Sequence, residues 1–541
     1  MAEISPLAQK LIQKYKEVYS EKERKKTSGF IHVDEVASKV AMFYEYIRTV
    51  VEWKEEHLMR RTAIIRKLKR KFLELELTGA SNLQVAAESL VLELIRGGHF
   101  PNDRIPEKKI KDVQAILEKY IFILKNNQAY QQGKRGYLTF YNWLIEVAAC
   151  EIEETLSSFH KEMALIEFMF ESMKQKIQIS EEIYKRNLLD AEEAKIQIFI
   201  AVCRALFKLD KPIIGYHLLK QKYPFWLQPN SEQLERIAKT IFTQWEEIEK
   251  SFIHPLGNKF YTVCEKYDTP YLLLGDILAE KNPFEIEKKI SNPSQLEELI
   301  KGAYFKRLNS LKSKIFRAAI YSTISIFITK ILFLLLIEIL IEGFMAKKVN
   351  PIIITGDILI PTLLMFAIVS AVKPPSKKNL SLIIIETMKI VYQKQSPEIY
   401  EIKLKKPRSI WLNLLLSLIY SLSAFLSISA IYYLLSYLGF PIFSIIIDII
   451  FIALILFTGT MVAKKMEELT IEEEKENFFT FLLDIFFLPL QGLGRWLADN
   501  WKKYNLIAAF FNALIDMPFS AFVEFLERWR EFLKERKEEL R

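Results

Sequence analysis

The sequence predicts an all-α fold, and two observations carry that prediction. Only three prolines precede Pro212, so the first part of the chain permits long uninterrupted helices. Four runs of about twenty or more mostly apolar residues come later, at residues 318–341, 351–372, 411–435 and 441–463. A helix of ~20 apolar residues spans the ~30 Å hydrocarbon core of a bilayer. No strand-type alternation persists long enough to predict a sheet.

These patterns divide the chain into three regions. Residues 1–300 are predicted to form a large helical domain on the cytosolic side of a membrane. Residues 301–463 are predicted to form a transmembrane domain in which four helices make two hairpins, with a cytosolic loop at 373–408. Residues 464–541 are predicted to add interfacial, aromatic-rich and amphipathic helices.

Start signals and apolar spacing place the helices of the first region. Asn230, Asn282 and Asn292 each stand where an N-cap is expected, with Glu or Gln three residues later. An aromatic cluster, Tyr216, Tyr223, Phe225 and Trp226, is predicted to pack between helices. We expect helices near residues 33–77, 81–96, 107–127, 137–178, 180–209 and 231–252.

Composition favours a membrane partner. The net charge of +9 suits an anionic membrane surface or nucleic acid, and the apolar runs favour the membrane over nucleic acid. The three cysteines form no CxxC pair and all precede the first apolar run, which indicates a reducing compartment. The charged N-terminus lacks the apolar core of a secretory signal peptide.

Loop charge predicts the orientation of the spans. Residues 301–317 carry six lysines or arginines and no acid, and residues 373–408 carry nine against three glutamates. Positive charge collects on the cytoplasmic side, so both termini and the 373–408 loop are predicted to be cytoplasmic in a multi-pass cell-membrane protein. Within this loop, residues 380–391 are apolar enough to form a short helix on the membrane face.

The chain beyond the fourth run predicts contact with the membrane surface. Residues 478–490 and 505–517 are apolar but short, which favours surface-lying, re-entrant or protein-packed segments over spans. Three cations between them, Arg495, Lys502 and Lys503, lie beside tryptophan and tyrosine, as in a headgroup layer, and are candidates for anionic lipid contact. Residues 518–541 predict an amphipathic helix for a membrane surface or a partner helix.

No enzyme motif is present in the sequence. It contains no HExxH, Walker loop or GxSxG, and Gly492-Leu-Gly494 lacks the third glycine of a dinucleotide site. Its six histidines are dispersed singly, and paired glutamates are common in a charged helical region. We therefore predict a non-enzymatic protein without a metal or cofactor.

A dense basic segment gives a second set of candidates for anionic lipid contact. The alternative is a solvated face whose charges pair with Glu52, Glu55 and Glu56 upstream, and we favour that alternative. The segment comprises Arg60, Arg61, Arg66, Lys67, Lys69, Arg70 and Lys71.

Charged residues inside the predicted spans are the sharpest candidates for a site. Lys330 and Glu338 lie in the first span, Asp357 in the second and Asp448 in the fourth. Charges at such depth are costly and normally face protein or water, so they mark an ion site or a structural pair. The structural interpretation, which we favour, is one Lys–Asp pair joining the hairpins, with Glu338 and Asp448 near the interface. Gly356 and Pro361 flank Asp357 and predict local opening of that span.

Two functions follow from these alternatives. The first is a membrane-anchored helical scaffold that binds other proteins through its cytosolic domain. The second is an ion channel or transporter, formed as a homo-oligomer, that uses the intramembrane charges. Both place the lipid bilayer among the partners of the chain.

Overall fold

A computed structural model describes most of the chain. The described residues are 3–24, 29–33, 39, 56–78, 83–127, 136–157, 159–280, 282–334, 351–372, 374–392, 399–404, 409–471, 478–504, 525, 529, 532, 533 and 536. Within these residues the fold is all-α, as predicted, apart from two three-residue strands. Residues 505–517, and all but five positions of 518–541, lie outside the described residues.

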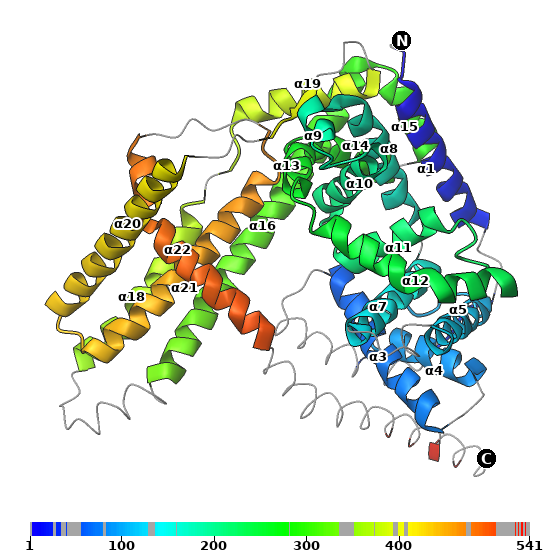
Figure 1. Ribbon diagram of the computed structural model, residues 1–541, viewed down its shortest axis with the longest axis horizontal. Coiled ribbons are helices and arrows are strands. Elements are labelled where there is room, and N and C mark those ends of the chain that lie inside the picture. Colours follow the sequence, from blue (N-terminus) through cyan, green and yellow to red (C-terminus); the bar gives the residue numbers. More distant parts are fainter. Residues whose placement is uncertain are drawn as a thin grey trace.

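The N-terminal region is an array of short and medium helices around one core (Figure 1). Its elements are α1 (Pro6–Arg24), α3 (Glu56–Thr78), α4 (Leu83–Arg96), α5 (Lys108–Lys125), α7 (Tyr137–Leu156), α8 (His160–Lys176), β1 (Ile177–Ile179), α9 (Glu181–Lys185), α10 (Ala191–Phe207), α11 (Lys211–Lys222), α12 (Ser231–Phe252), α13 (Gly257–Lys266), α14 (Asp268–Glu280) and α15 (Pro283–Ile290).

Asparagine caps set several helix starts, as predicted. Asn230 makes a complete capping box with Gln233 at the start of α12. Asn282 and Asn292 accept backbone N–H bonds at the starts of their helices, each followed by proline. The predicted helix at 137–178 is wrong in one respect: α7 ends at Leu156, and α8 begins at His160.

The second region is built from longer, more apolar helices. They are α16 (Pro293–Phe333), α18 (Pro351–Ser370), α19 (Lys377–Tyr392), β2 (Tyr400–Ile402), α20 (Ile410–Tyr437), α21 (Ile442–Glu467) and α22 (Phe478–Tyr504). Among the described residues, five of these are long and apolar enough to cross a membrane: α16, α18, α20, α21 and residues 480–500 of α22. The chain therefore has the character of a multi-pass membrane protein.

The fifth candidate span corrects the prediction that the segment after residue 477 is too short. The helix does not end near Leu490 but continues through Pro489 to Tyr504. It runs across α20 and α21 rather than alongside them (Figure 1), and it contacts both. A Cβ at Gly494 would lie 2.1 Å from the carbonyl oxygen of Ala453, so this close crossing requires glycine. The predicted number of four spans is therefore not confirmed.

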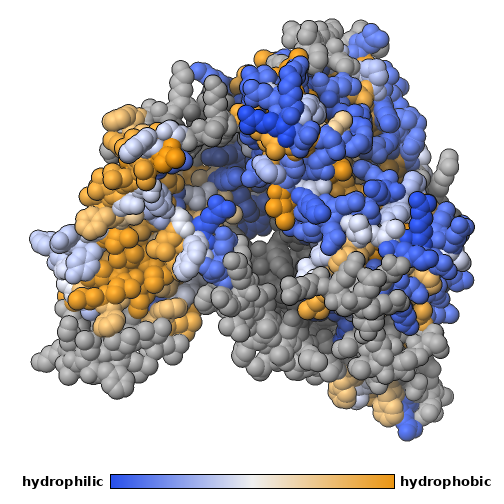
Figure 2. All heavy atoms as spheres, in the orientation of Figure 1, coloured by the Kyte–Doolittle hydropathy of each residue, from blue (hydrophilic) through white to orange (hydrophobic). Residues whose placement is uncertain are grey.

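Surface polarity separates the two regions. Figure 2 shows apolar side chains over the group of long helices and polar side chains over the N-terminal region. The third span is the most exposed, with Trp411 81% and Tyr437 90% accessible at its two ends. Exposed apolar surface of this extent fits contact with lipid.

The two regions are joined by continuous structure. The helix α16 begins beside α14 and α15 and continues without a break among the long apolar helices, where its second half is a candidate span. The loop between α18 and α20 returns to the N-terminal region, where β2 pairs in parallel with β1. The Ser5 amide donates to the carbonyl of Val391, at 2.8 Å, and the Tyr392 hydroxyl donates to Ile290.

This junction corrects the prediction of a helix on the membrane face. A helix forms as expected at α19, but its buried face, with Ile383, Thr387 and Val391, packs on α14 and α16. Amphipathic spacing predicts that one face is buried without saying whether lipid or protein covers it. Here protein covers it.

Candidate intramembrane charge site

Three spans contribute one charged side chain each to a buried cluster, which we call the intramembrane triad. Lys330 comes from α16, Asp357 from α18 and Asp448 from α21. These helices contact one another, so the triad lies where both predicted hairpins meet. The three residues are 0%, 1% and 1% exposed.

The lysine ammonium lies between the two carboxylates. Lys330 Nζ is 2.9 Å from Asp357 Oδ2 and 2.9 Å from Asp448 Oδ1. One ammonium therefore bridges three helices, a geometry that fixes their register.

Neighbouring side chains complete the site. The Ser444 hydroxyl, one turn before Asp448 on α21, donates to Asp357 Oδ1 at 2.5 Å. The Phe451 ring lies under the ammonium, with its centroid 5.4 Å from Lys330 Nζ. Phe440 is buried beside Gly356, where a Cβ would lie 3.2 Å from the Phe440 ring.

Charge balance defines what the triad can do. With both carboxylates ionised, the three residues carry one net negative charge in an apolar surrounding, which costs free energy. The cluster becomes neutral when one carboxyl group holds a proton or when a further cation binds. The site can therefore act as a structural clasp or as a proton or cation site.

The structure corrects two expectations about these residues. Asp448 does not lie near the interface as a bystander, because it is as buried as Asp357 and shares its lysine. The second span does not open at Asp357, since α18 is helical throughout and includes Pro361. Glu338 lies outside the described residues.

Sequence reasoning missed Ser444 and Phe451. Both had a weak signal: they lie four residues before and three residues after Asp448, so all three share one helix face. Serine and phenylalanine are common in apolar spans, and only the contact with α18 and α16 distinguishes them.

Five of the seven cations in the basic segment of α3 approach three acids from other parts of the chain. Lys67, Arg70 and Lys71 all approach Glu93 on α4, at 3.2, 2.5 and 3.7 Å. These contacts lower the pKa of Glu93 against the opposing effect of burial, which is the largest single influence.

Two further arginines of α3 face α7 and the start of α11. Arg61 is 2% exposed and pairs with Asp210, and Arg60 lies 3.8 Å from Glu153. The side chains of the expected partners Glu52, Glu55 and Glu56 lie outside the described residues, so that pairing stays a prediction. The partners observed for these α3 cations are Glu93, Glu153 and Asp210. Arg61 is buried, so the segment is not a fully solvated face. Lys69 is exposed, and Arg66 is half-buried.

The cations near the end of α22 are described in part. Arg495 is 3.7 Å from Asp499, one turn later on the same helix. Trp496 beside it is 61% exposed. The side chains of Lys502 and Lys503 lie outside the described residues.

A second buried ion pair lies in the N-terminal region. Lys119 Nζ is 2.5 Å from Glu151 Oε1, and both residues are at most 5% exposed. The Tyr120 hydroxyl and the Trp226 indole N–H donate to Glu151 Oε2 at 2.9 and 3.0 Å. Lys119 also donates to the Trp226 carbonyl at 2.9 Å. Burial lowers the pKa of Lys119, and Glu151 opposes this shift.

Metal-binding side chains do not converge in the described part of the chain. No group of three or more histidine, cysteine, aspartate or glutamate residues there could hold a metal ion. His217 is buried, and burial lowers its pKa to about 4. It stacks near Phe159, at a centroid distance of 6.3 Å, which indicates a packing role.

Comparison with known proteins adds no relative. No protein-family model, curated protein or solved structure matches this chain.

Proposed function

We propose that the chain is a membrane-anchored, non-enzymatic helical scaffold that holds its N-terminal region at a fixed orientation to the bilayer and presents it to other proteins. The supporting observation is the junction: α16 passes from one region into the other without a break. A region carried on a flexible linker would need no such element.

Further contacts at the junction support a fixed orientation. The Thr269 hydroxyl donates to the carbonyl of Glu468, immediately after α21, at 2.9 Å. Asn379 bonds both Leu469 and Ile471, at 2.6 and 2.8 Å. The segment just after α21 is thereby tied to α14 of the N-terminal region and to the start of α19.

The proposal places the N-terminal region in the cytoplasm of a cell. The reason is the excess of lysine and arginine in residues 301–317 and 373–408, on the side of the spans that carries this region. The accessibility of an introduced cysteine in intact cells tests whether the N-terminal region faces the cytoplasm. Residue 185 on α9, made cysteine, should react with a membrane-impermeant maleimide only after the cells are opened.

Site-specific photo-crosslinking in intact cells tests the scaffold role. Leu138 and Ile253 are apolar residues of the N-terminal region that are 73% and 74% exposed. A photoreactive residue at one of these positions should give a discrete adduct that a probe at Tyr437, on α20, does not give. If no position of the N-terminal region yields a discrete adduct, the scaffold proposal fails.

A second candidate function is a proton or cation pathway, and the excess carboxylate of the triad supports it. Proteoliposome flux assays test this candidate. It requires flux that Asp357→Asn and Asp448→Asn together abolish, while Asp499→Asn leaves flux unchanged. A pathway between subunits also requires an oligomer, so a strict monomer in mild detergent would weaken it.

A further inference from the structure

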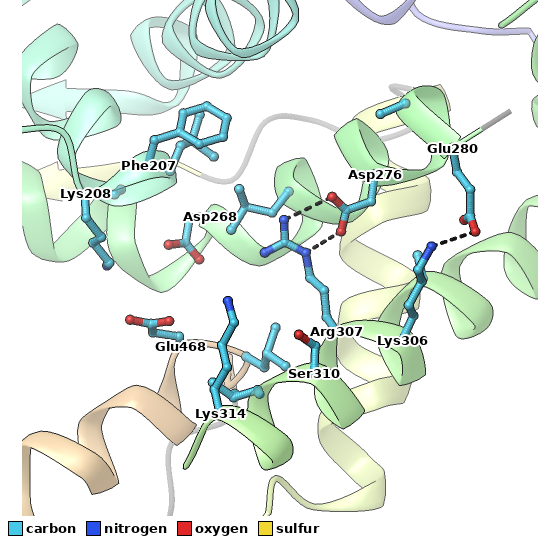
Figure 3. A pocket seen from close by; sticks show the side chains of 17 residues that line it. Phe207, Lys208, Asp268, Asp276, Glu280, Lys306, Arg307, Ser310, Lys314 and Glu468 are labelled. Atoms are coloured by element: carbon cyan, nitrogen blue, oxygen red, sulfur yellow. Dashed lines mark hydrogen bonds and ion pairs between the residues drawn. The ribbon is translucent and has the colours of Figure 1, made fainter. Parts of the chain in front are cut away.

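A cavity of about 670 Å³ lies where the two regions meet (Figure 3). It is lined by the end of α10, one face of α14, the first half of α16 and the residues just after α21, and it is open to solvent on one side. The cavity contains no residue of the intramembrane triad.

The cavity lies at the level where the chain enters the membrane. Lys314 lines it and stands one helical turn before the apolar run that begins at residue 318. From Phe316 onward α16 exposes apolar side chains, with Phe316 64% and Tyr321 51% accessible. Leu469, which also lines the cavity, follows the end of α21 by two residues. Lipid headgroups would occupy this level.

Four cations line the cavity: Lys208, Lys306, Arg307 and Lys314. Two of them are held in place by acids of α14. Arg307 makes a two-point contact with Asp276, and Lys306 lies 2.8 Å from Glu280. Figure 3 shows the Lys314 side chain pointing into the cavity. Among the described residues, no ion pair of Lys314 lies within 4.0 Å.

Two further acids, Asp268 and Glu468, also line the cavity. Asp268 is 4% exposed, and burial raises its pKa to about 8, so its carboxyl group is mostly neutral at pH 7. Glu468 is exposed at the edge, beside the end of α21. A phosphate group near Lys314 would therefore meet little repulsion from Asp268.

The remaining wall is apolar, with Leu206, Phe207, Leu272, Leu311 and Leu469. The cavity thus combines an apolar wall with a lysine at the level of the bilayer surface. This combination fits a lipid better than a free ion, because the lysine can bind the phosphate and the apolar wall can contact the acyl chains. We propose that this junction cavity binds the phosphate of an anionic phospholipid headgroup, with Lys314 as its principal contact and Ser310 and Arg307 beside it. This inference does not depend on the scaffold function.

Native mass spectrometry of the full-length protein tests the proposal. The protein is extracted after incubation with vesicles of equal phosphatidylglycerol and phosphatidylcholine with matched acyl chains. The wild type should retain one phosphatidylglycerol in preference to phosphatidylcholine. The Lys314→Gln substitution should lower the amount of retained phosphatidylglycerol about fivefold.

Lys312→Gln is the matched control, because Lys312 is exposed on the same helix at nearly the same depth but does not line the cavity. Its retention should equal that of the wild type. Equal losses in both variants, or equal retention of the two lipids, would overturn the proposal. So would Lys314-dependent thermal stabilisation by inorganic phosphate that phosphatidylglycerol does not reproduce, because the site would then bind free phosphate.

Discussion

Two buried charge clusters in the described part of the chain combine lysine with carboxylates in different proportions. In the N-terminal region one lysine meets one glutamate, and hydroxyl and indole donors bind the remaining carboxylate oxygen. In the intramembrane triad one lysine meets two aspartates, with one serine donor on Asp357. The first cluster is neutral and well supplied with donors, whereas the second has a carboxylate in excess.

This difference distinguishes a structural ion pair, in which the charges balance, from a site that can still bind a proton or a cation. Removing either member of the Lys119–Glu151 pair leaves an uncompensated buried charge. Removing one aspartate from the triad instead leaves a neutral Lys–Asp pair. Charge pairing with Lys330 alone therefore does not explain the second carboxylate of the triad.

The largest effect is expected from removing the shared cation. Lys330→Met leaves two buried carboxyl groups facing each other, and we expect it to cost about 3–5 kcal/mol of unfolding free energy. Thermal unfolding in mild detergent measures the loss. Lys312→Met, on the exposed part of the same helix, should change little. Equal stability of both variants would show that the triad does not hold the spans together.

A loss of similar or slightly smaller size is expected in the N-terminal cluster. Glu151→Met removes the carboxylate partner of the Lys119 ammonium and of the Tyr120 and Trp226 side-chain donors, and leaves Lys119 only its bond to the Trp226 carbonyl. We expect a cost of about 3–5 kcal/mol. Tryptophan fluorescence during unfolding measures this loss of stability directly, because Trp226 lies in the cluster. Glu181→Met, at an exposed pair, is the control. A mild effect would mean that water replaces the lost carboxylate.

Asp268 shows what a buried carboxyl group does without a close ammonium. Its pKa is raised from 3.8 to about 8, chiefly by burial. An acid with a raised folded-state pKa stabilises fully below pH 4, and this contribution is lost as pH rises through 8. The wild type should therefore lose stability relative to Asp268→Asn as pH rises from 4 to 8. Parallel stability–pH curves of the two proteins would contradict the assignment.

The smallest effect on stability is expected from Asp448→Asn. The variant retains the Lys330–Asp357 pair and becomes neutral, so a change of less than about 1 kcal/mol is expected. The same detergent unfolding assay measures it beside Lys330→Met. If both variants lose the same stability, the second aspartate is an essential part of the clasp and not a spare group.

The sequence predicted the helical class and three complete spans because apolar run length depends only on local composition. It also placed Lys330 and Asp357 together, since a buried lysine needs a carboxylate. It placed Asp448 wrongly, because depth along a span does not say which neighbour a helix face meets. The lateral arrangement of α16, α18 and α21 decides that contact.

Two other differences have the same physical origin. The pairing of β1 with β2 involves three residues in each strand, too few for an alternating pattern. Gly492-Leu-Gly494 in α22 does not match a dinucleotide site, and its sequence does not show that Gly494 permits a close crossing with Ala453. Contacts between distant segments decide both features, and no local pattern reports them.

A distance measurement between the two regions tests most directly whether they form one fixed unit. Spin labels at residues 181 on α9 and 461 on α21 replace side chains that are well exposed. The native Cys150, Cys203 and Cys264 are buried, which raises the pKa of their thiols and slows their labelling. In lipid nanodiscs we expect one narrow distance distribution. A broad distribution would indicate a flexible linkage between the two regions. Two resolved distances would indicate that the regions exchange between two arrangements. Either result would contradict a fixed scaffold.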